Sequence, residues 1–238
     1  GVAAFPMDYA LKNENARIMM LKPKDAALGE RAANIMYDII VTGDKDPSKK
    51  VGYDYFMNLE DPSRMTCSAV TYWGYRYASN DAFKIPQEKS SLRLGLDQIF
   101  SQTGIQSGPM LTAGDVELDS RFKLVLEFRD PRLIEDSRIR DVVSLSLFNW
   151  MQQGYQLRTT LKTVAIDTII YPARKTPFWP MVRDMSGSPD FPADMPVGFI
   201  KTLAQVDGVG EALYKRLLAA NDVYRKKTGW SLSYEQMM

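Results

Sequence analysis

The hydrophobic pattern alternates most clearly in residues 122–128, which read FKLVLEF. Apolar side chains at every second position project to one side of an extended chain, so this pattern predicts a β-strand with one buried face. A compact apolar run at residues 17–22 (RIMMLK), closed by Pro23, predicts a second, buried strand.

Helices are predicted where apolar residues recur at spacings of three and four. Asp25 is a suitable N-cap for a helix that runs to about Val41 and that Gly43 ends. Asp136 or Ser137 is a suitable cap for a later helix. The expected inward face of this later helix consists of Ile139, Val142 or Val143, Leu147 and Trp150.

Two further helices are predicted at residues 199–206 and 211–226, joined by a bend at Asp207-Gly208-Val209-Gly210. The bend resembles the helix-hairpin-helix element, which binds DNA phosphates through backbone N–H groups at a helix start. Any tight corner between two helices also requires such glycines. Nucleic-acid binding is therefore only a minor alternative.

Residues 51–79 hold the only cysteine of the chain, Cys67. The run Asp61-Pro62-Ser63 predicts a turn, which puts Cys67 in the first turn of the helix that follows. One stripe of this helix consists of Cys67, Val70, Thr71, Gly74 and Ala78. Because Gly74 and Ala78 are small, we expect the helix to approach a neighbour closely, with Cys67 pressed against that neighbour.

A cysteine in this position is a candidate nucleophile. The unpaired N–H groups and the positive end of the helix dipole favour a thiolate, and the same N–H groups can receive an oxyanion. The alternative is that Cys67 acts as a small hydrophobic residue of the core, which is the more common role of a lone cysteine. A thiol hydrolase also needs a base, and the sequence contains no histidine.

Composition restricts the other classes of protein. The 238 residues are 45% hydrophobic and 25% charged, which is enough apolar material for one sizeable core and a small second lobe. The net charge is +1, so no global field attracts the chain to nucleic acid or anionic lipid. One cysteine excludes an internal disulfide. Zinc ligands are lacking and no loop has calcium spacing, so we expect no cofactor. No apolar run approaches the roughly 18 residues that span a bilayer.

These elements predict an α+β fold in four segments. Residues 1–110 hold the cysteine segment, and residues 111–170 add a strand and helices that complete the core. Residues 171–198 form an irregular proline-rich strap, because six of the 13 prolines and several aromatic residues fall there. Residues 199–238 form a C-terminal helical hairpin.

Two stretches near the cysteine resemble a known family. The run Gly52-Tyr53-Asp54-Tyr55-Phe56 is followed, after a short spacer, by Met65-Thr66-Cys67-Ser68-Ala69-Val70. They are similar to the Tyr-Asp-x-x-Phe and Tyr-Cys-Ser-Glu-Leu-Val segments of the circularly permuted papain-like hydrolases, the YiiX-like relatives of the NlpC-type cell-wall peptidases. Residues 113–122 and 127–132 resemble the tail of longer members, so the resemblance covers about residues 1–150.

The resemblance implies a permuted papain-like half, with a small antiparallel sheet packed on the cysteine helix and a helical C-terminal elaboration. It implies an amide or ester hydrolase of the bacterial cell envelope that acts on peptidoglycan peptides or acyl lipids. Cys67 would be the nucleophile, Tyr53 an oxyanion donor, and Asp54, Ser68 and Tyr72 would contact the substrate. By residue type alone, Tyr53 and Tyr72 are typical of aromatic packing and Asp54 of a turn or cap.

The sequence departs from the family in two places. Ala69 stands where the family commonly has an acidic residue, and no histidine precedes Cys67. Because the chain opens at Gly1-Val2 without an initiator methionine, we expect a preceding segment or a separate chain to carry the histidine. The rival interpretation is an inactive member that binds a peptide or lipid without turning it over.

Overall fold

The computed structural model describes residues 2–12, 15–87, 111–155, 171–173, 176–177, 179 and 195–238. These parts combine helices with two small sheets, so the chain belongs to the α+β class that the sequence predicts. The chain forms two compact units, and the boundary between them falls within helix α6 (Pro131–Gln152). This division differs from the four segments expected from the sequence. Most of the proline-rich strap expected at residues 171–198 lies outside the described residues.

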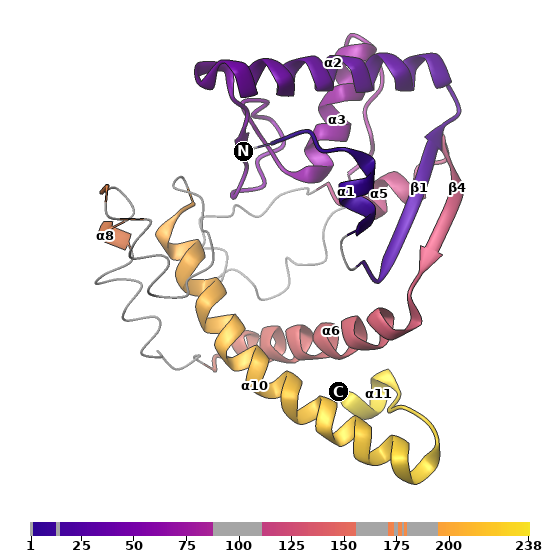
Figure 1. Ribbon diagram of the computed structural model, residues 1–238, viewed down its shortest axis with the longest axis vertical. Helices are drawn as coiled ribbons and strands as arrows, with labels where there is room; N and C mark the ends of the chain where they lie inside the picture. Colours follow the sequence, from indigo (N-terminus) through magenta and orange to yellow (C-terminus); the bar gives the residue numbers. More distant parts are fainter. Residues whose placement is uncertain are drawn as a thin grey trace. The chain divides into compact units, whose positions relative to one another are not determined.

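The first unit contains an antiparallel pair of strands, β1 (Arg17–Pro23) and β4 (Phe122–Arg129), which lie side by side in Figure 1. Both strands are where the hydrophobic pattern predicts them. The register shifts between Met20 and Leu21, so one strand carries an extra residue at this point.

One face of the sheet is held by charged side chains. The guanidinium of Arg17 donates to Glu127 of β4 at 2.7 Å and to Glu117 of helix α5 (Ala113–Leu118) at 3.0 Å. Arg129 also donates to Glu127 at 2.7 Å. These ion pairs tie α5 to this side of the sheet.

The other face is apolar, and much of it is exposed in the described part of the structure. The register pairs Ile18 with Phe128 and Met20 with Leu126, and paired residues project to the same side. Met20, Leu126 and Phe128 are 41%, 56% and 52% exposed. The prediction that β4 buries one face is therefore wrong, because Phe122 is the only buried residue of this strand.

Helix α2 (Ala26–Lys45) begins where the sequence predicts, because Asp25 Oδ1 accepts a hydrogen bond from the Leu28 N–H at 2.9 Å. Gly43 does not end the helix. It is a buried interior position, and a Cβ atom there would lie 2.9 Å from the Lys50 Cα atom. Gly43 therefore allows the chain after the helix to pass close to it.

Helix α3 (Cys67–Ala78) crosses α2, as Figure 1 shows, and packs against it. A Cβ atom at Gly74 would lie 2.9 Å from Met36 Cγ and 3.2 Å from the Ala32 backbone oxygen. The close helix approach expected from the small residues is confirmed. The core around this crossing consists of Leu28, Ala32, Met36, Val51, Leu59, Met65, Ala69, Tyr72, Trp73, Tyr75, Ile85 and Phe122.

Short elements complete the first unit. They are helix α1 (Met7–Lys12), the 3-10 turn η1 (Pro47–Lys49), and the parallel strands β2 (Gly52–Tyr53) and β3 (Arg64–Met65).

The second unit is helical in its described parts. Besides most of α6 it contains the short α8 (Tyr171–Ala173), the long α10 (Val197–Thr228) and α11 (Tyr234–Met237). Helix α6 begins earlier than predicted, because Asp130 acts as its cap and accepts from the Arg132 N–H at 2.9 Å. The predicted inward face is buried at Ile139, Val142, Val143 and Leu147, whereas Trp150 is 41% exposed.

Helix α10 is continuous, so the predicted bend at Asp207–Gly210 and the helical hairpin are wrong. Gly208 and Gly210 lie inside the helix, and neither has a positive φ. A Cβ atom at Gly210 would be only in ordinary contact with Leu147 and Val143, at 3.6 Å from each. Tertiary packing along α6 thus overrides the weak helix propensity of two glycines.

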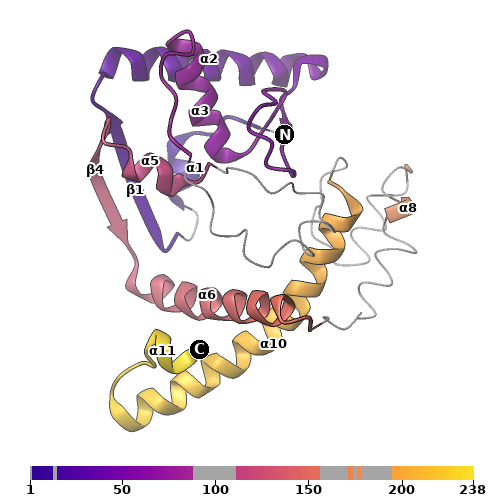
Figure 2. The same ribbon diagram turned by 180° about the vertical axis from the view of Figure 1, so that it is seen from behind.

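The true end of α10 is at Gly229, whose φ of 80° suits glycine and whose N–H donates to the Arg225 carbonyl at 2.8 Å. The chain then returns to α11. Met237 of α11 packs with Ile139 and Val142 of α6, and Figure 2 shows α11 beside α6 and the C-terminal half of α10.

Candidate functional site

The start of α3 is fixed by the turn that precedes it. Asp61 Oδ1 accepts from both the backbone N–H and the hydroxyl of Ser63, at 2.9 and 2.7 Å. These hydrogen bonds lower the pKa of Asp61 below its usual value. The predicted turn is confirmed, and it leads through β3 to Thr66, the N-cap of α3.

Thr66 accepts hydrogen bonds from only some of the backbone N–H groups at the start of α3. Its side chain accepts from the Ala69 N–H at 3.2 Å, and its carbonyl accepts from the Val70 N–H at 3.2 Å. The first N–H groups of a helix, here those of Cys67 and Ser68, have no partner inside the helix. They are donors at the positive end of a 12-residue helix.

Cys67 itself is exposed, so the expectation that it is pressed against a neighbouring element is wrong. Its Sγ atom lies 4.0 Å from the hydroxyl oxygen of the half-buried Ser68. The buried face of α3 is formed instead by Ala69, Tyr72, Trp73, Gly74 and Tyr75. The helix thus turns its aromatic side inward and leaves the thiol accessible.

Tyr53 is brought next to this helix start by strand pairing. Gly52 donates to Ser63, Tyr53 pairs with Met65, and Asp54 donates to the Met65 carbonyl at 3.3 Å. Partial burial raises the pKa of Tyr53, and the proximity of Cys67 and Asp54 raises it further. A raised pKa keeps the phenol protonated near neutral pH, so Tyr53 remains a hydrogen-bond donor.

The other predicted contact residues face inward. Asp54 is 4% exposed, and its Oδ1 accepts from the Phe56 N–H at 2.8 Å, which is the turn role left open by the sequence. Tyr72 is 4% exposed, and its ring stands nearly perpendicular to that of Trp73, with the ring centroids 5.7 Å apart. Of the three predicted contact residues, only Ser68 lies next to the thiol in the described structure.

A cluster around Arg76 was missed by sequence reasoning. Arg76 lies over the Trp73 ring at 4.3 Å, donates to the Tyr72 hydroxyl at 3.3 Å and pairs with both carboxylate oxygens of Asp81. Hydrogen bonding to Asp81 raises the pKa of Arg76. The i, i+4 spacing of Tyr72 and Arg76 was the available signal. The cluster locks the C-terminal half of α3, away from Cys67.

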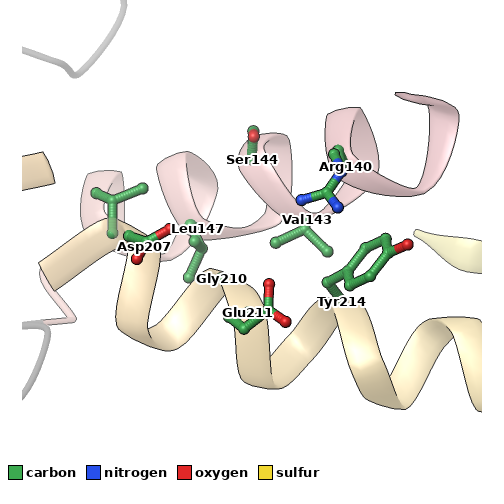
Figure 3. Close-up of a pocket in the computed structure, with 9 residues that line it drawn as sticks. Arg140, Val143, Ser144, Leu147, Asp207, Gly210, Glu211 and Tyr214 are labelled. Atoms are coloured by element: carbon green, nitrogen blue, oxygen red, sulfur yellow. The ribbon is translucent and has the colours of Figure 1, made fainter. Parts of the chain in front are cut away.

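A second group that the sequence did not reveal lies in the second unit. A hollow of about 200 Å³ is lined by Arg140, Val143, Ser144 and Leu147 of α6 and by Val206, Asp207, Gly210, Glu211 and Tyr214 of α10 (Figure 3). This is smaller than the roughly 300–1,000 Å³ of a typical ligand pocket.

Arg140 and Tyr214, which line this hollow, both pair with Asp136. Arg140 donates to Asp136 at 2.8 Å and lies over the Tyr214 ring at 4.2 Å, and the Tyr214 hydroxyl donates to the same carboxylate. Both hydrogen bonds lower the pKa of Asp136, that of Tyr214 most. Since these groups satisfy one another, the cluster connects the two helices.

The described residues contain no group of three or more acidic or cysteine side chains that could hold a metal ion. None of the helices in the described part of the chain is both long and apolar enough to cross a membrane.

Fold and site together define an α+β protein with an accessible thiol at a helix start and a tyrosine beside it. Comparison of the chain with protein families, with curated proteins and with solved structures finds no match.

Proposed function

We propose that the first unit is a thiol-dependent amide or ester hydrolase in which Cys67 is the nucleophile and the base comes from outside this chain. The observation that carries the proposal is the accessible Cys67 thiol at the start of α3, with Tyr53 held beside it by β2 and β3. The similarity of residues 52–56 and 65–70 to permuted papain-like hydrolases supports the same assignment.

The chemistry follows from these groups. The Cys67 sulfur attacks the substrate carbonyl carbon and forms a C–S bond, and the carbonyl oxygen becomes an oxyanion. The N–H groups at the start of α3 and the Tyr53 hydroxyl donate to that oxyanion. The base takes the thiol proton and returns it to the leaving amine or alkoxide. Water then cleaves the acyl-enzyme and restores the thiol.

Peptidoglycan peptides and acyl lipids are the proposed substrate classes, because the family resemblance implies them. Ser68 borders the thiol and is the proposed first contact for the substrate. The bacterial cell envelope is the proposed location on the same ground.

The catalytic half of the proposal can be tested on this chain alone with p-nitrophenyl acetate. The activated ester needs little help from a general acid, so Cys67 is expected to release one equivalent of p-nitrophenol and to carry one acetyl group by mass spectrometry. Cys67→Ser should abolish the fast release. Tyr53→Phe should slow it by about 10²-fold if the hydroxyl stabilises the oxyanion.

Tyr77→Phe is the matched control, because Tyr77 and Tyr53 are both 38% exposed. It should leave the acetylation rate unchanged. Added imidazole, a soluble substitute for the missing base, should convert the single release into slow turnover. An acetylation rate equal to that of a free thiol would contradict the proposal.

The second candidate is an inactive relative that binds a peptide or lipid at the same surface. The absence of histidine from all 238 residues favours it. In that case imidazole would give no turnover, and Tyr53→Phe would not alter the thiol reaction. The helix-hairpin-helix alternative is not retained, because α10 is continuous where the bend would have to be.

A further inference from the structure

We propose that the C-terminal end of α10 docks on an anionic phospholipid bilayer. The docking surface, here called the terminal patch, consists of Ala219, Ala220, Val223, Lys226, Lys227 and Trp230. It belongs to the second unit and does not depend on the function proposed for Cys67.

The terminal patch is open and apolar. A shallow hollow of about 480 Å³ is lined there by Ala219, Ala220, Val223, Tyr224, Lys227 and Leu232. The spacing of 219, 220, 223 and 227 puts these residues on one helix face. Val223, which lines the hollow, is 68% exposed, and Trp230, two residues after the last residue of α10, is 77% exposed, so the helix end carries two exposed apolar side chains.

The opposite face of α10 holds the helix in place. Leu217 and Leu218 pack around Ile139 and Val142 of α6. Asn221 is 1% exposed, accepts from the Leu232 N–H at 2.8 Å and donates to Glu135 at 3.0 Å. The helix end is therefore anchored from one side, and the apolar residues of the other side are presented on a fixed support.

Of the three basic residues near the terminal patch, only Arg225 forms ion pairs with described carboxylates. Arg225 is neutralised by Glu135 at 3.2 Å and Asp222 at 2.7 Å. Lys226 and Lys227 have no ion pair with any described carboxylate. Lys226 and Lys227 lie one turn after Val223 on the helix and a few residues before Trp230 in the sequence, so two cations without a described ion-pair partner lie at this helix end, although the chain as a whole is almost neutral.

This combination fits the interface of an anionic bilayer. Tryptophan partitions to the headgroup level, where its ring is buried and its N–H stays hydrated. Lysine can place its alkyl chain along apolar surface while its ammonium reaches a lipid phosphate. The small residues Ala219 and Ala220, about one turn before Val223, let lipid chains approach the helix closely. The alternative occupant is a second copy of this chain, with Trp230 of each copy in the hollow of the other.

The test is sedimentation of the intact chain with vesicles of phosphatidylcholine and phosphatidylglycerol (1:1), beside vesicles of phosphatidylcholine alone. We expect binding to the anionic vesicles at least tenfold stronger than to the neutral ones, with strong weakening at high salt. Trp230→Ala should weaken it about tenfold or more. Lys226→Glu/Lys227→Glu should weaken it to a similar extent, because each lysine near the surface contributes about fivefold and reversal adds repulsion.

The controls are Trp150→Ala, which removes another exposed tryptophan of the second unit, and Lys49→Glu/Lys50→Glu, which reverses two exposed lysines of the first unit. Both should bind like the unmodified chain. Absence of vesicle binding, or binding that Trp230→Ala leaves unchanged, would overturn the proposal. Dimerisation that is seen by sedimentation equilibrium without vesicles and lost in Trp230→Ala would assign the patch to a second copy and would also overturn it.

Discussion

Gly74 of α3 lies directly against Met36 of α2, and a Cβ atom at Gly74 would come within 2.9 Å of Met36 Cγ. The same atom would lie 3.2 Å from the backbone oxygen of Ala32, which cannot move without moving α2. This contact sets how closely the helix that presents Cys67 approaches its support.

Gly74→Ala is therefore expected to destabilise the first unit. Overpacking costs about 1–3 kcal/mol, and the better helix propensity of alanine offsets up to about 1 kcal/mol of that. We expect a net loss of about 1 kcal/mol in the free energy of unfolding, measured by urea denaturation. In a Met36→Ala background, Gly74→Ala should cost less stability than in the unmodified chain, because the shortened residue 36 makes room for the new methyl group. Equal losses in both backgrounds would show that the two residues are not in contact.

Local signals predicted the elements around Cys67 well. Asp25 predicts a helix cap, Asp61 a turn and Gly74 a close helix crossing. Each of these three features depends on only a few neighbouring residues. Burial was predicted less well. The alternation in β4 implies a covered face, but whether another element covers it depends on the tertiary arrangement, and Leu126 is 56% exposed.

The same limit applies to the site and to α10. The spacing of Cys67 and Gly74 predicts that both lie on the buried face of the helix. The large rings of Tyr72 and Trp73 contribute more to burial than the small residues do, so they decide which side of α3 faces the core, and Cys67 stays exposed. From the sequence alone, Gly208 and Gly210 predict a bend, because helix propensity is a local signal. The contacts of Gly210 with α6 lie more than 60 residues away in the sequence, so no local pattern revealed them.

Gly208→Ala tests the continuity of α10. No atom lies within 4 Å of a Cβ built on Gly208, so alanine is expected to raise the free energy of unfolding by about 0.5–1 kcal/mol through helix propensity. Thermal unfolding followed by circular dichroism measures the change. Gly229→Ala is the matched control and should lower stability, since its φ of 80° strains any residue with a Cβ. A loss of stability in Gly208→Ala would mean that residue 208 lies in a turn.

The ion pair between Asp119 and Arg121 should make the stability of the first unit depend on pH. The side chain of Asp119 is only 4% exposed and accepts from Arg121 Nη2 at 2.6 Å. This hydrogen bond is the main cause that lowers the pKa of Asp119 in the folded chain. A lowered folded pKa stabilises the fold above the unfolded pKa of about 3.9, and the contribution disappears as the pH falls through the folded value.

Asp119→Asn is accordingly expected to lose about 2 kcal/mol at pH 7, the range for a hydrogen bond between charged groups. The difference from the unmodified chain should narrow below about pH 4, as the native carboxylate becomes protonated. Urea denaturation at pH 7, 4 and 3 measures it. Glu60→Gln, at an exposed loop position, should show neither effect. A difference that stays constant with pH would assign the loss to packing and not to charge.

Phe122 and Leu126 are both apolar residues of β4, but we expect their substitutions to change stability by different amounts, because only Phe122 is buried. Phe122 is 9% exposed, and its ring centroid lies 5.3 Å from that of Tyr75 and 6.1 Å from that of Phe83. Phe122→Ala should therefore lower the free energy of unfolding by about 3–5 kcal/mol. Leu126→Thr should change the free energy of unfolding by less than about 0.5 kcal/mol, because the side chain already meets water. It should also raise solubility by interrupting an exposed apolar surface. Urea denaturation and the saturating protein concentration measure the two effects. A loss in Leu126→Thr as large as that in Phe122→Ala would mean that this face of the sheet is covered in solution.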